Sequence, residues 1–170
     1  FPVYSSEELI TLLGEYLPRI DSSLLEPWEA MTGMGLYDMS PGSSGRYGGA
    51  YTTDLLYFHC PFLFASLEEN CYDLLTVTHE FGHFSDFWFN PQTDILTQVD
   101  NLDLSEIHSN ALQALFTRFY GELFEQGAEV AEFINLSNLL ENIIDGCIYD
   151  EFQRRTLDSG EPLTPELINA

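Results

Sequence analysis

Lysine is absent from this 170-residue sequence, and only five basic residues, all arginine, oppose 28 acidic ones. The formal net charge is −23 at pH 7. Nucleic acids and anionic membrane surfaces are bound through cationic side chains that replace counterions, so this composition argues against both as partners. The same charge favours cationic ligands such as metal ions or basic peptides. A generally acidic proteome would produce the same composition.

Cysteine is also scarce, and long apolar runs are missing. Cys60, Cys71 and Cys147 form no CxxC pair, and an odd, sparse set predicts buried free thiols in a reducing compartment. No stretch of 18 or more apolar residues occurs, so we expect no membrane span. The sequence begins "FPVYSSEEL", without an initiator methionine or a cationic, apolar leader. We therefore expect no signal peptide and a chain that is part of a longer one.

Apolar residues make up 45% of the chain and aromatic residues 14%, enough for one folded domain over residues 1–170 with a substantial core. Near the N-terminus, Ser5 and Glu8 have the spacing of a capping box at the start of a helix. Apolar residues then recur at helical spacing until Pro18, which we expect to interrupt this helix. A second short helix is predicted over 22–31.

Residues 33–66 are rich in Gly, Ser, Tyr and Phe. They predict two or three short strands joined by turns at "SPGSSG" (40–45) and "TTD" (52–54). Helical periodicity then returns in four stretches, at 69–89, at 102–126, at about 128–156 with a possible break near Gly146, and from Thr164 onward. The pattern predicts a mainly α fold with a small β-sheet, of the α+β class.

The helix predicted over 69–89 contains the motif His-Glu-Phe-Gly-His. His79 and His83 are four residues apart and project from one helix face, which suits two corners of a tetrahedral zinc site. Glu80 can lie beside the metal without binding it, as a general base for hydrolysis. The pattern arises by chance in roughly 1% of chains of this composition. A helix with two surface histidines is the structural alternative.

A third zinc ligand is expected from a neighbouring helix. Glu106, in "LSEIHSNALQALF", lies 27 positions after His79. This separation allows one helix to end, a loop to turn at "NPQTD", and the next helix to return antiparallel. A local alternative exists, because Asp103 and Glu106 also have the spacing of a helix N-cap and its N3 residue.

Five segments in this order carry a family resemblance: "GRYGGAY", "HCPFLFAS", "DLLTVTHEFGHF", "LSEIHSNA" and "YDEFQRRTLDSGEPLTPELIN". Together they cover nearly the whole chain and resemble the catalytic region of the thimet oligopeptidase family, most closely its oligoendopeptidase F branch. The resemblance implies a zincin-like catalytic core with an HExxH helix and a glutamate-ligand helix. It also implies a cytoplasmic metallopeptidase that holds one zinc ion per chain and cleaves short peptides.

The resemblance also implies individual roles. His79, His83 and Glu106 would bind zinc, and Glu80 would activate water. "GGAY" looks like an edge strand that pairs with the substrate backbone, formed by Gly48, Gly49, Ala50 and Tyr51; glycine there permits close approach of a peptide.

Other polar residues around the motif depart from the family pattern or have weaker assignments. Arg46 stands where the family usually has lysine, and Asp86 where many members have a histidine that is not a ligand. His108 points to a different face from Glu106, which indicates that it supports a ligand residue or the structure without binding zinc itself. Asn110 could hydrogen-bond a ligand histidine or face solvent, and His59 could approach the cleft or be structural.

The family has further parts that these 170 residues lack, namely a downstream segment rich in His and Tyr and a long helical N-terminal half. We expect the remainder of a parent chain to complete the cleft. The predicted function is a zinc-dependent endopeptidase. The alternative is a non-catalytic zinc-binding fragment, or a pseudo-enzyme module, that lacks the rest of the substrate channel.

Overall fold

The computed structural model describes residues 2–91, 102–158, 160 and 164–165. Contacts divide the chain into two compact units, Phe1–Glu129 and Val130–Ala170. The first unit contains five α-helices and one three-stranded sheet among its described residues. The predicted mainly helical α+β class is confirmed.

Helix α1 (Ser6–Ile20) begins as the sequence predicts, because the Ser5 side chain accepts from the Glu8 amide and the Glu8 carboxylate accepts from the Ser5 amide. The expectation that Pro18 interrupts this helix is wrong, since α1 continues to Ile20. Pro18 removes the hydrogen bond that an N–H would give to the carbonyl four residues earlier, but only two helical residues follow it, and Leu17 beside it is fully buried.

A 3-10 turn (Ser22–Leu24) leads into α2 (Leu25–Met34). This confirms a second short helix, which extends three residues beyond the predicted end. Gly35, at φ 66°, ends it in the left-handed conformation that glycine adopts most readily.

Three strands form the sheet in the order β1-β3-β2. Strands β1 (Tyr37–Pro41) and β3 (Cys60–Leu67) are parallel, while β2 (Ala50–Leu55) is antiparallel to β3. The predicted turn at 52–54 is wrong, because these residues lie inside β2. Threonine is β-branched and fits a strand well, and the turn comes instead at residues 56–59.

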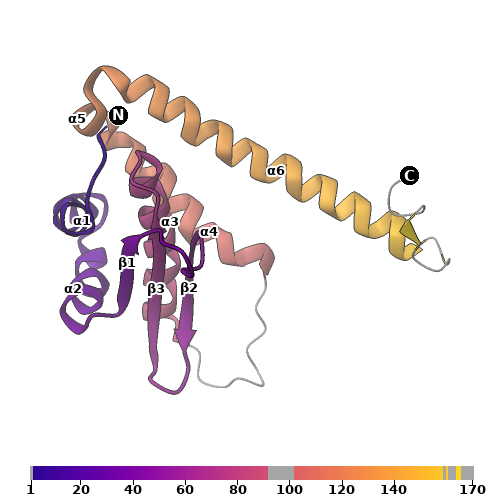
Figure 1. The fold of residues 1–170 in the computed structure, drawn as a ribbon, viewed down its shortest axis with the longest axis horizontal. Helices are drawn as coiled ribbons and strands as arrows, with labels where there is room; N and C mark the ends of the chain where they lie inside the picture. The colour runs from indigo at the N-terminus through magenta and orange to yellow at the C-terminus, as the bar shows by residue number, and fades with distance from the viewer. Residues whose placement is uncertain (1, 92–101, 159, 161–163, 166–170) are drawn as a thin grey trace. The chain divides into compact units, whose positions relative to one another are not determined.

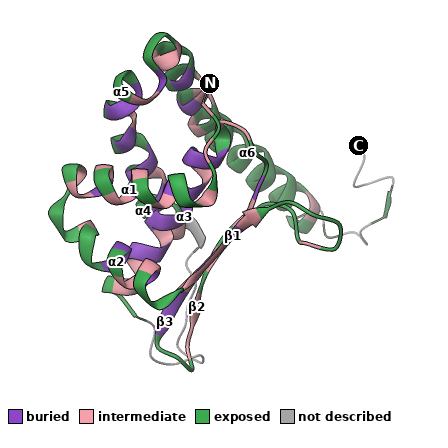
Figure 2. Ribbon diagram, turned by 60° about the vertical axis from the view of Figure 1, so that its left-hand side comes forward, coloured by how far each residue is buried: buried purple, intermediate pink, exposed green. Residues whose placement is uncertain are grey.

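The two faces of β3 differ in burial. Leu63, Ala65 and Leu67 are buried on the face that packs against helix α3 (Tyr72–Phe89), whereas Phe62 and Phe64 on the other face are only half-buried. Helix α3 contacts both β2 and β3 and lies with α4 (Leu102–Phe116) on one side of the sheet (Figure 1). Buried residues recur along α1, α2 and α3 (Figure 2). The core therefore lies between the helices and this face of the sheet.

The connection from β3 to α3 is held by one carboxylate. Asp73, in the first turn of α3, is 4% exposed. Its Oδ1 accepts from the Glu68 amide at 2.9 Å, and its Oδ2 accepts from the Asn70 amide at 3.2 Å. An acidic side chain is also favourable at a helix N-terminus because of the helix dipole.

The continuous helix predicted over 102–126 is divided in the structure. Helix α4 ends at Phe116 and is followed by a 3-10 turn (Thr117–Phe119), the short helix α5 (Tyr120–Phe124) and a second 3-10 turn (Glu125–Gly127). Glu125 has φ 45°, which interrupts helical geometry after α5. Glu122 of α5 accepts two hydrogen bonds from Arg19, which ties α5 to α1.

The second unit consists mainly of helix α6 (Ala128–Asp158), which begins two residues before the unit does. This helix is not broken at Gly146. The predicted helix from Thr164 falls largely on residues outside those described. Within the described residues, no helix combines the length and apolar character needed to cross a membrane. All three cysteines are free, but only Cys60 is buried; Cys71 is half-buried and Cys147 exposed, so the expected burial holds for one of them.

Candidate metal centre

Helix α3 presents the two histidines of the HExxH motif side by side. His79 and His83 are one turn apart, and their ring centroids are separated by 5.0 Å. Both side chains are largely buried, with 22% and 15% of their surfaces exposed. The Phe81 and Phe84 side chains on the opposite part of α3 are fully buried, which fixes the rotation of the helix and keeps the histidines at its accessible face.

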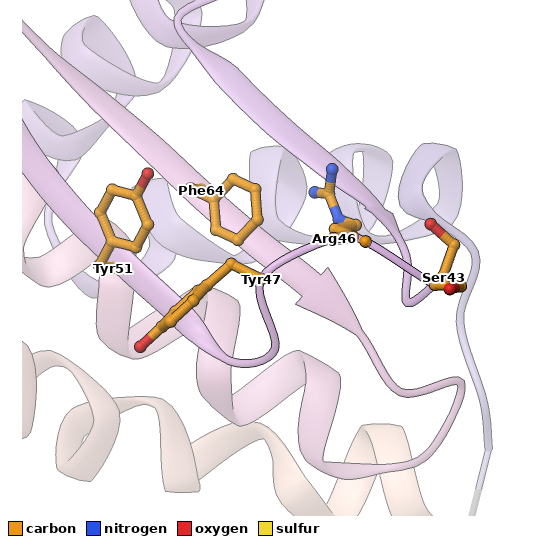
Figure 3. Close-up of a pocket in the computed structure, with 7 residues that line it drawn as sticks. Ser43, Arg46, Tyr47, Tyr51 and Phe64 are labelled. Carbon is orange, nitrogen blue, oxygen red and sulfur yellow. The ribbon is translucent and has the colours of Figure 1, made fainter.

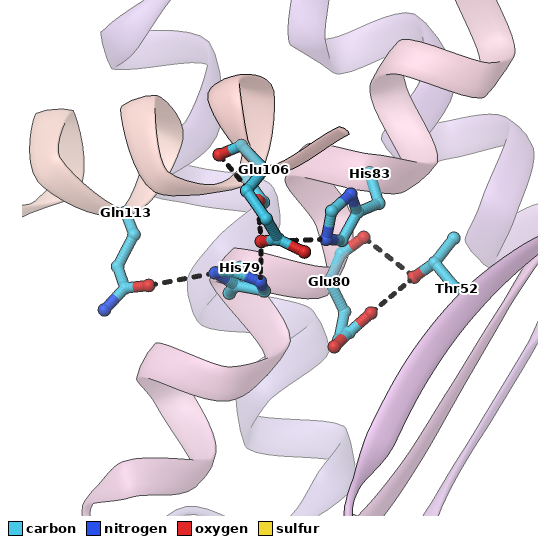
Figure 4. Close-up of polar contacts among 7 residues, drawn as sticks. Thr52, His79, Glu80, His83, Glu106 and Gln113 are labelled. Atoms are coloured by element: carbon cyan, nitrogen blue, oxygen red, sulfur yellow. Dashed lines mark hydrogen bonds and ion pairs between the residues drawn. The ribbon is translucent and has the colours of Figure 1, made fainter. Parts of the chain in front are cut away.

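Glu106 of α4 completes a group of three ligand-type side chains (Figure 4). Its Oε2 lies 3.1 Å from the His79 Nε2 and 3.5 Å from the His83 Nε2. Donors held about 2.0–2.1 Å from a tetrahedral zinc ion are about 3.4 Å apart. The donor types and spacings of this group therefore fit zinc. The Glu106 Oε2 points to the histidines, while the alternative capping box with Asp103 involves a side chain outside those described.

A residue not predicted from the sequence holds His79. The Gln113 Oε1 lies 3.1 Å from the His79 Nδ1 (Figure 4). An amide oxygen only accepts hydrogen bonds, so this contact calls for a proton on Nδ1. Nε2, which faces Glu106, is then the ring nitrogen that could bind a metal. Gln113 is 8% exposed and lies seven residues, or two turns, after Glu106 on the same helix face.

Glu80 is the most buried ionisable side chain of the motif, at 7% exposure. The Thr52 hydroxyl of β2 lies 2.9 Å from the Glu80 Oε2 and also 2.9 Å from the Glu80 main-chain oxygen (Figure 4). Glu80 thus lies between the metal-ligand group of α3 and α4 on one side and the edge strand on the other.

Burial controls the protonation of this group. It raises the pKa of the Glu80 carboxyl above its ordinary value, while the hydrogen bond from Thr52 and the nearby His79 oppose that rise. Burial also lowers the pKa of His83, against the opposing effect of the Glu106 carboxylate. The neutral imidazole, which is the form that binds a metal, is therefore favoured at His83.

The other histidines and Asn110 lie outside the ligand group. His108 pairs with Asp86, Nε2 to Oδ1 at 3.3 Å, which links α4 to α3 beside the site. The predicted role of His108, to support a ligand or the structure, stays a prediction. The buried Oδ1 of Asn110 has no hydrogen-bond partner among the described residues, and Gln113 contacts the ligand histidine instead. His59 lies in the exposed turn between β2 and β3 with φ 53°.

Two of the four residues predicted to bind substrate lie in β2. The strand begins at Ala50, so Gly48 and Gly49 precede it, and Tyr51 is its second residue. Gly49 has φ 98°, a conformation that favours glycine. The Tyr51 ring stacks on Phe64 with centroids 5.1 Å apart, on the sheet face opposite Thr52 and Glu80.

A depression of about 740 Å³ lies on this opposite face (Figure 3). Aromatic rings of Tyr47, Tyr51 and Phe64 line it together with Arg46. The Arg46 guanidinium is already engaged, because it binds Asp38 through both Nη atoms and lies 4.3 Å from the Phe64 ring centroid. The depression contains none of the histidines and not Glu80, so we place the chemistry at the α3–α4 group.

Comparison with family models and with curated protein sequences gives no match. Solved structures do match. A Bacillus anthracis protein described as oligoendopeptidase F has a TM-score of 0.83 at 22% identity, over 99% of this chain and 31% of its own. PZ peptidase A, solved with an inhibitor, has a TM-score of 0.78 at 23% identity, over 90% of this chain and 27% of its own.

A third structure, described as a peptidase from Chlamydophila abortus, has a TM-score of 0.67 at 20% identity over 98% of this chain. The chain spans less than a third of the length of each of these three proteins. Its helices and small sheet therefore have the fold of one segment of oligoendopeptidase F and PZ peptidase structures.

Proposed function

We propose that this chain is part of a zinc-dependent endopeptidase that hydrolyses short peptides. The observation that carries the proposal is the convergence of His79, His83 and Glu106 on one point, with the buried Glu80 beside them. Structural likeness to peptidases over nearly the whole chain supports the same reaction class. His79, His83 and Glu106 would hold the metal, one zinc per chain.

Zinc bound there would supply a Lewis acid that polarises the peptide carbonyl and makes water more acidic. The chain's own part in the reaction is proton transfer. The Glu80 carboxylate accepts a proton from the attacking water and delivers it to the leaving amine, so it is regenerated with each turnover. A raised pKa makes this carboxyl a better base than an exposed glutamate.

The substrate would bind at β2. This strand forms an edge of the sheet, and among the described residues no further strand pairs with its outer side. An extended peptide can add to such an edge through main-chain hydrogen bonds that do not depend on its sequence. We also propose a cytoplasmic location and a parent chain whose remaining parts complete the cleft.

The test combines metal content with hydrolysis. After reconstitution, atomic emission should give one zinc per chain, and Glu106→Ala should lose or weaken that zinc. Glu80→Gln should retain zinc but lose hydrolysis of a quenched fluorescent peptide, measured in the full-length parent protein. Glu29→Gln, at an exposed glutamate of α2, is the matched control and should behave as the unmodified protein. Loss of zinc in Glu80→Gln would contradict the role given to Glu80.

A further inference from the structure

We propose that Thr52 is a positioning residue that fixes where the base and the substrate lie relative to each other, an inference that rests on the proposed function. Its side chain would hold Glu80, and its own main chain would hydrogen-bond the peptide. One residue of the edge strand would then fix both reacting partners.

The side-chain half of this proposal comes from two contacts. The Thr52 Oγ1 lies 2.9 Å from the Glu80 Oε2 and 2.9 Å from the Glu80 carbonyl oxygen. One hydroxyl proton shared between these acceptors fixes the carboxylate relative to its own main chain. Because the Glu80 Oε2 accepts the hydrogen bond from Thr52, we assign proton transfer to the Glu80 Oε1.

Because Glu80 is buried, its carboxylate depends on the hydrogen bond from Thr52. Only 7% of Glu80 is exposed, so water has little access to replace the hydroxyl. A buried acceptor that loses its partner bears the cost of its lost hydration without compensation. Without Thr52 Oγ1, the carboxylate is expected to rotate toward other donors or toward solvent, away from its position beside His79.

The main-chain half comes from the register of β2 on β3. Residues of an antiparallel pair alternate between those that exchange main-chain hydrogen bonds and those that do not. The Ser66 amide donates to the Gly49 carbonyl at 2.9 Å, which marks that pair as bonded. Thr52 faces Leu63, three pairs further along. The alternation therefore directs the Thr52 N–H and C=O away from β3, toward the free edge.

Side chains alternate with the same period of two residues. The β2 residues with edge-facing main chain, Ala50, Thr52 and Asp54, thus also direct their side chains to the α3 face. Thr53 has the opposite orientation and is exposed. A peptide paired with Thr52 would consequently lie next to the residue that holds Glu80, so the register of the substrate sets which carbonyl meets the base.

The experiment compares three variants in the full-length parent protein. Thr52→Val removes the hydroxyl and keeps the shape, Thr52→Ser restores the hydroxyl, and Thr53→Val makes the same change on the outer face. For Thr52→Val we expect kcat to fall by about 10–100-fold, because small displacements of a catalytic group have effects of this size. KM should change by less than about threefold. Thr52→Ser should recover most of the lost kcat, and Thr53→Val should match the parent.

A second readout is independent of activity. Crystal structures of the zinc-free proteins should show the Glu80 carboxylate rotated in Thr52→Val and unchanged in Thr52→Ser and Thr53→Val. Unchanged kcat in Thr52→Val, or equal loss in Thr52→Ser, would overturn the proposal. If the parent binds zinc but hydrolyses no peptide, the proposed function fails, and the Glu80 conformation alone then decides whether Thr52 positions it.

Discussion

Gly82 of α3 lies against the main chain of Ser109 in α4. A methyl group added at Gly82 would stand 2.9 Å from the Ser109 amide nitrogen and 3.1 Å from the His108 carbonyl oxygen. These are backbone atoms of a facing helix, so no rotamer change can move them away. The glycine inside the HExxH motif therefore permits the close helix crossing that brings Glu106 to His79 and His83.

Gly82→Ala should consequently separate the two helices. We expect the unfolding free energy to fall by about 1–3 kcal/mol, the usual cost of overpacking, and zinc affinity to fall with it. Urea unfolding and a zinc titration against a chelator measure the two effects. Gly33→Ala is the control, because the same methyl group in α2 would meet nothing within 4 Å. It should leave stability equal or slightly higher. Equal stability of both variants would argue against this explanation of the motif's glycine.

Gln113 should affect metal binding without being a ligand. Gln113→Leu removes the acceptor at the His79 Nδ1, and loss of such a partner costs about 10–100-fold in metal affinity. Gln113→Glu keeps an acceptor and should preserve binding. The dissociation constant for zinc, measured by chelator competition, tests both. Gln126→Leu, at an exposed glutamine, should leave it unchanged. Zinc affinity that stays the same in Gln113→Leu would remove Gln113 from the site.

His108 should be dispensable for zinc. Its side chain is 53% exposed and pairs with Asp86 rather than joining the ligand group. His108→Ala is expected to retain one zinc per chain, and its stability should fall by at most about 1 kcal/mol, as for other exposed pairs. Atomic emission on this variant beside Glu106→Ala makes the comparison. A loss of zinc from both would give His108 a ligand role.

The Arg46–Asp38 pair should make stability depend on acidic pH. Arg46 holds the pKa of the Asp38 carboxyl below its ordinary value, so the folded state favours the carboxylate. The stabilisation is complete above the unfolded-state pKa, near 4, and is lost as the pH falls through the lower folded-state value. Asp38→Asn should therefore lower the free energy of unfolding at pH 7 by up to about 1 kcal/mol. The difference in stability between the variant and the unmodified protein should shrink below pH 4. Urea unfolding at several pH values tests this, and a constant difference down to the lowest pH would contradict it.

Much of the helical framework follows from local patterns. The capping box at Ser5 and Glu8 marks the start of α1 correctly, and the periodicity of residues 69–89 places His79 and His83 on a helix. The limit of local signals appears at Pro18, where burial of neighbouring Leu17 outweighs a helix breaker. It appears again after Phe116, where the predicted long helix gives way to short turns.

The residues around the proposed metal ligands are harder to predict. The prediction of a turn at 52–54 misses Thr52, because its contact with Glu80 joins residues that are far apart in the sequence. Gln113 had a detectable signal, since it lies two turns after Glu106 on the same face. Asn110, one turn after Glu106, is the nearer candidate by spacing. Only the crossing of α3 and α4 determines which of the two reaches His79.

The Asp73 carboxylate has a mechanical consequence. By accepting hydrogen bonds from Glu68 and Asn70, it joins the end of β3 to the first turn of α3. The short segment between β3 and the helix that carries Glu80 is thereby tied to that helix, so the start of α3 has a fixed position relative to the end of the strand.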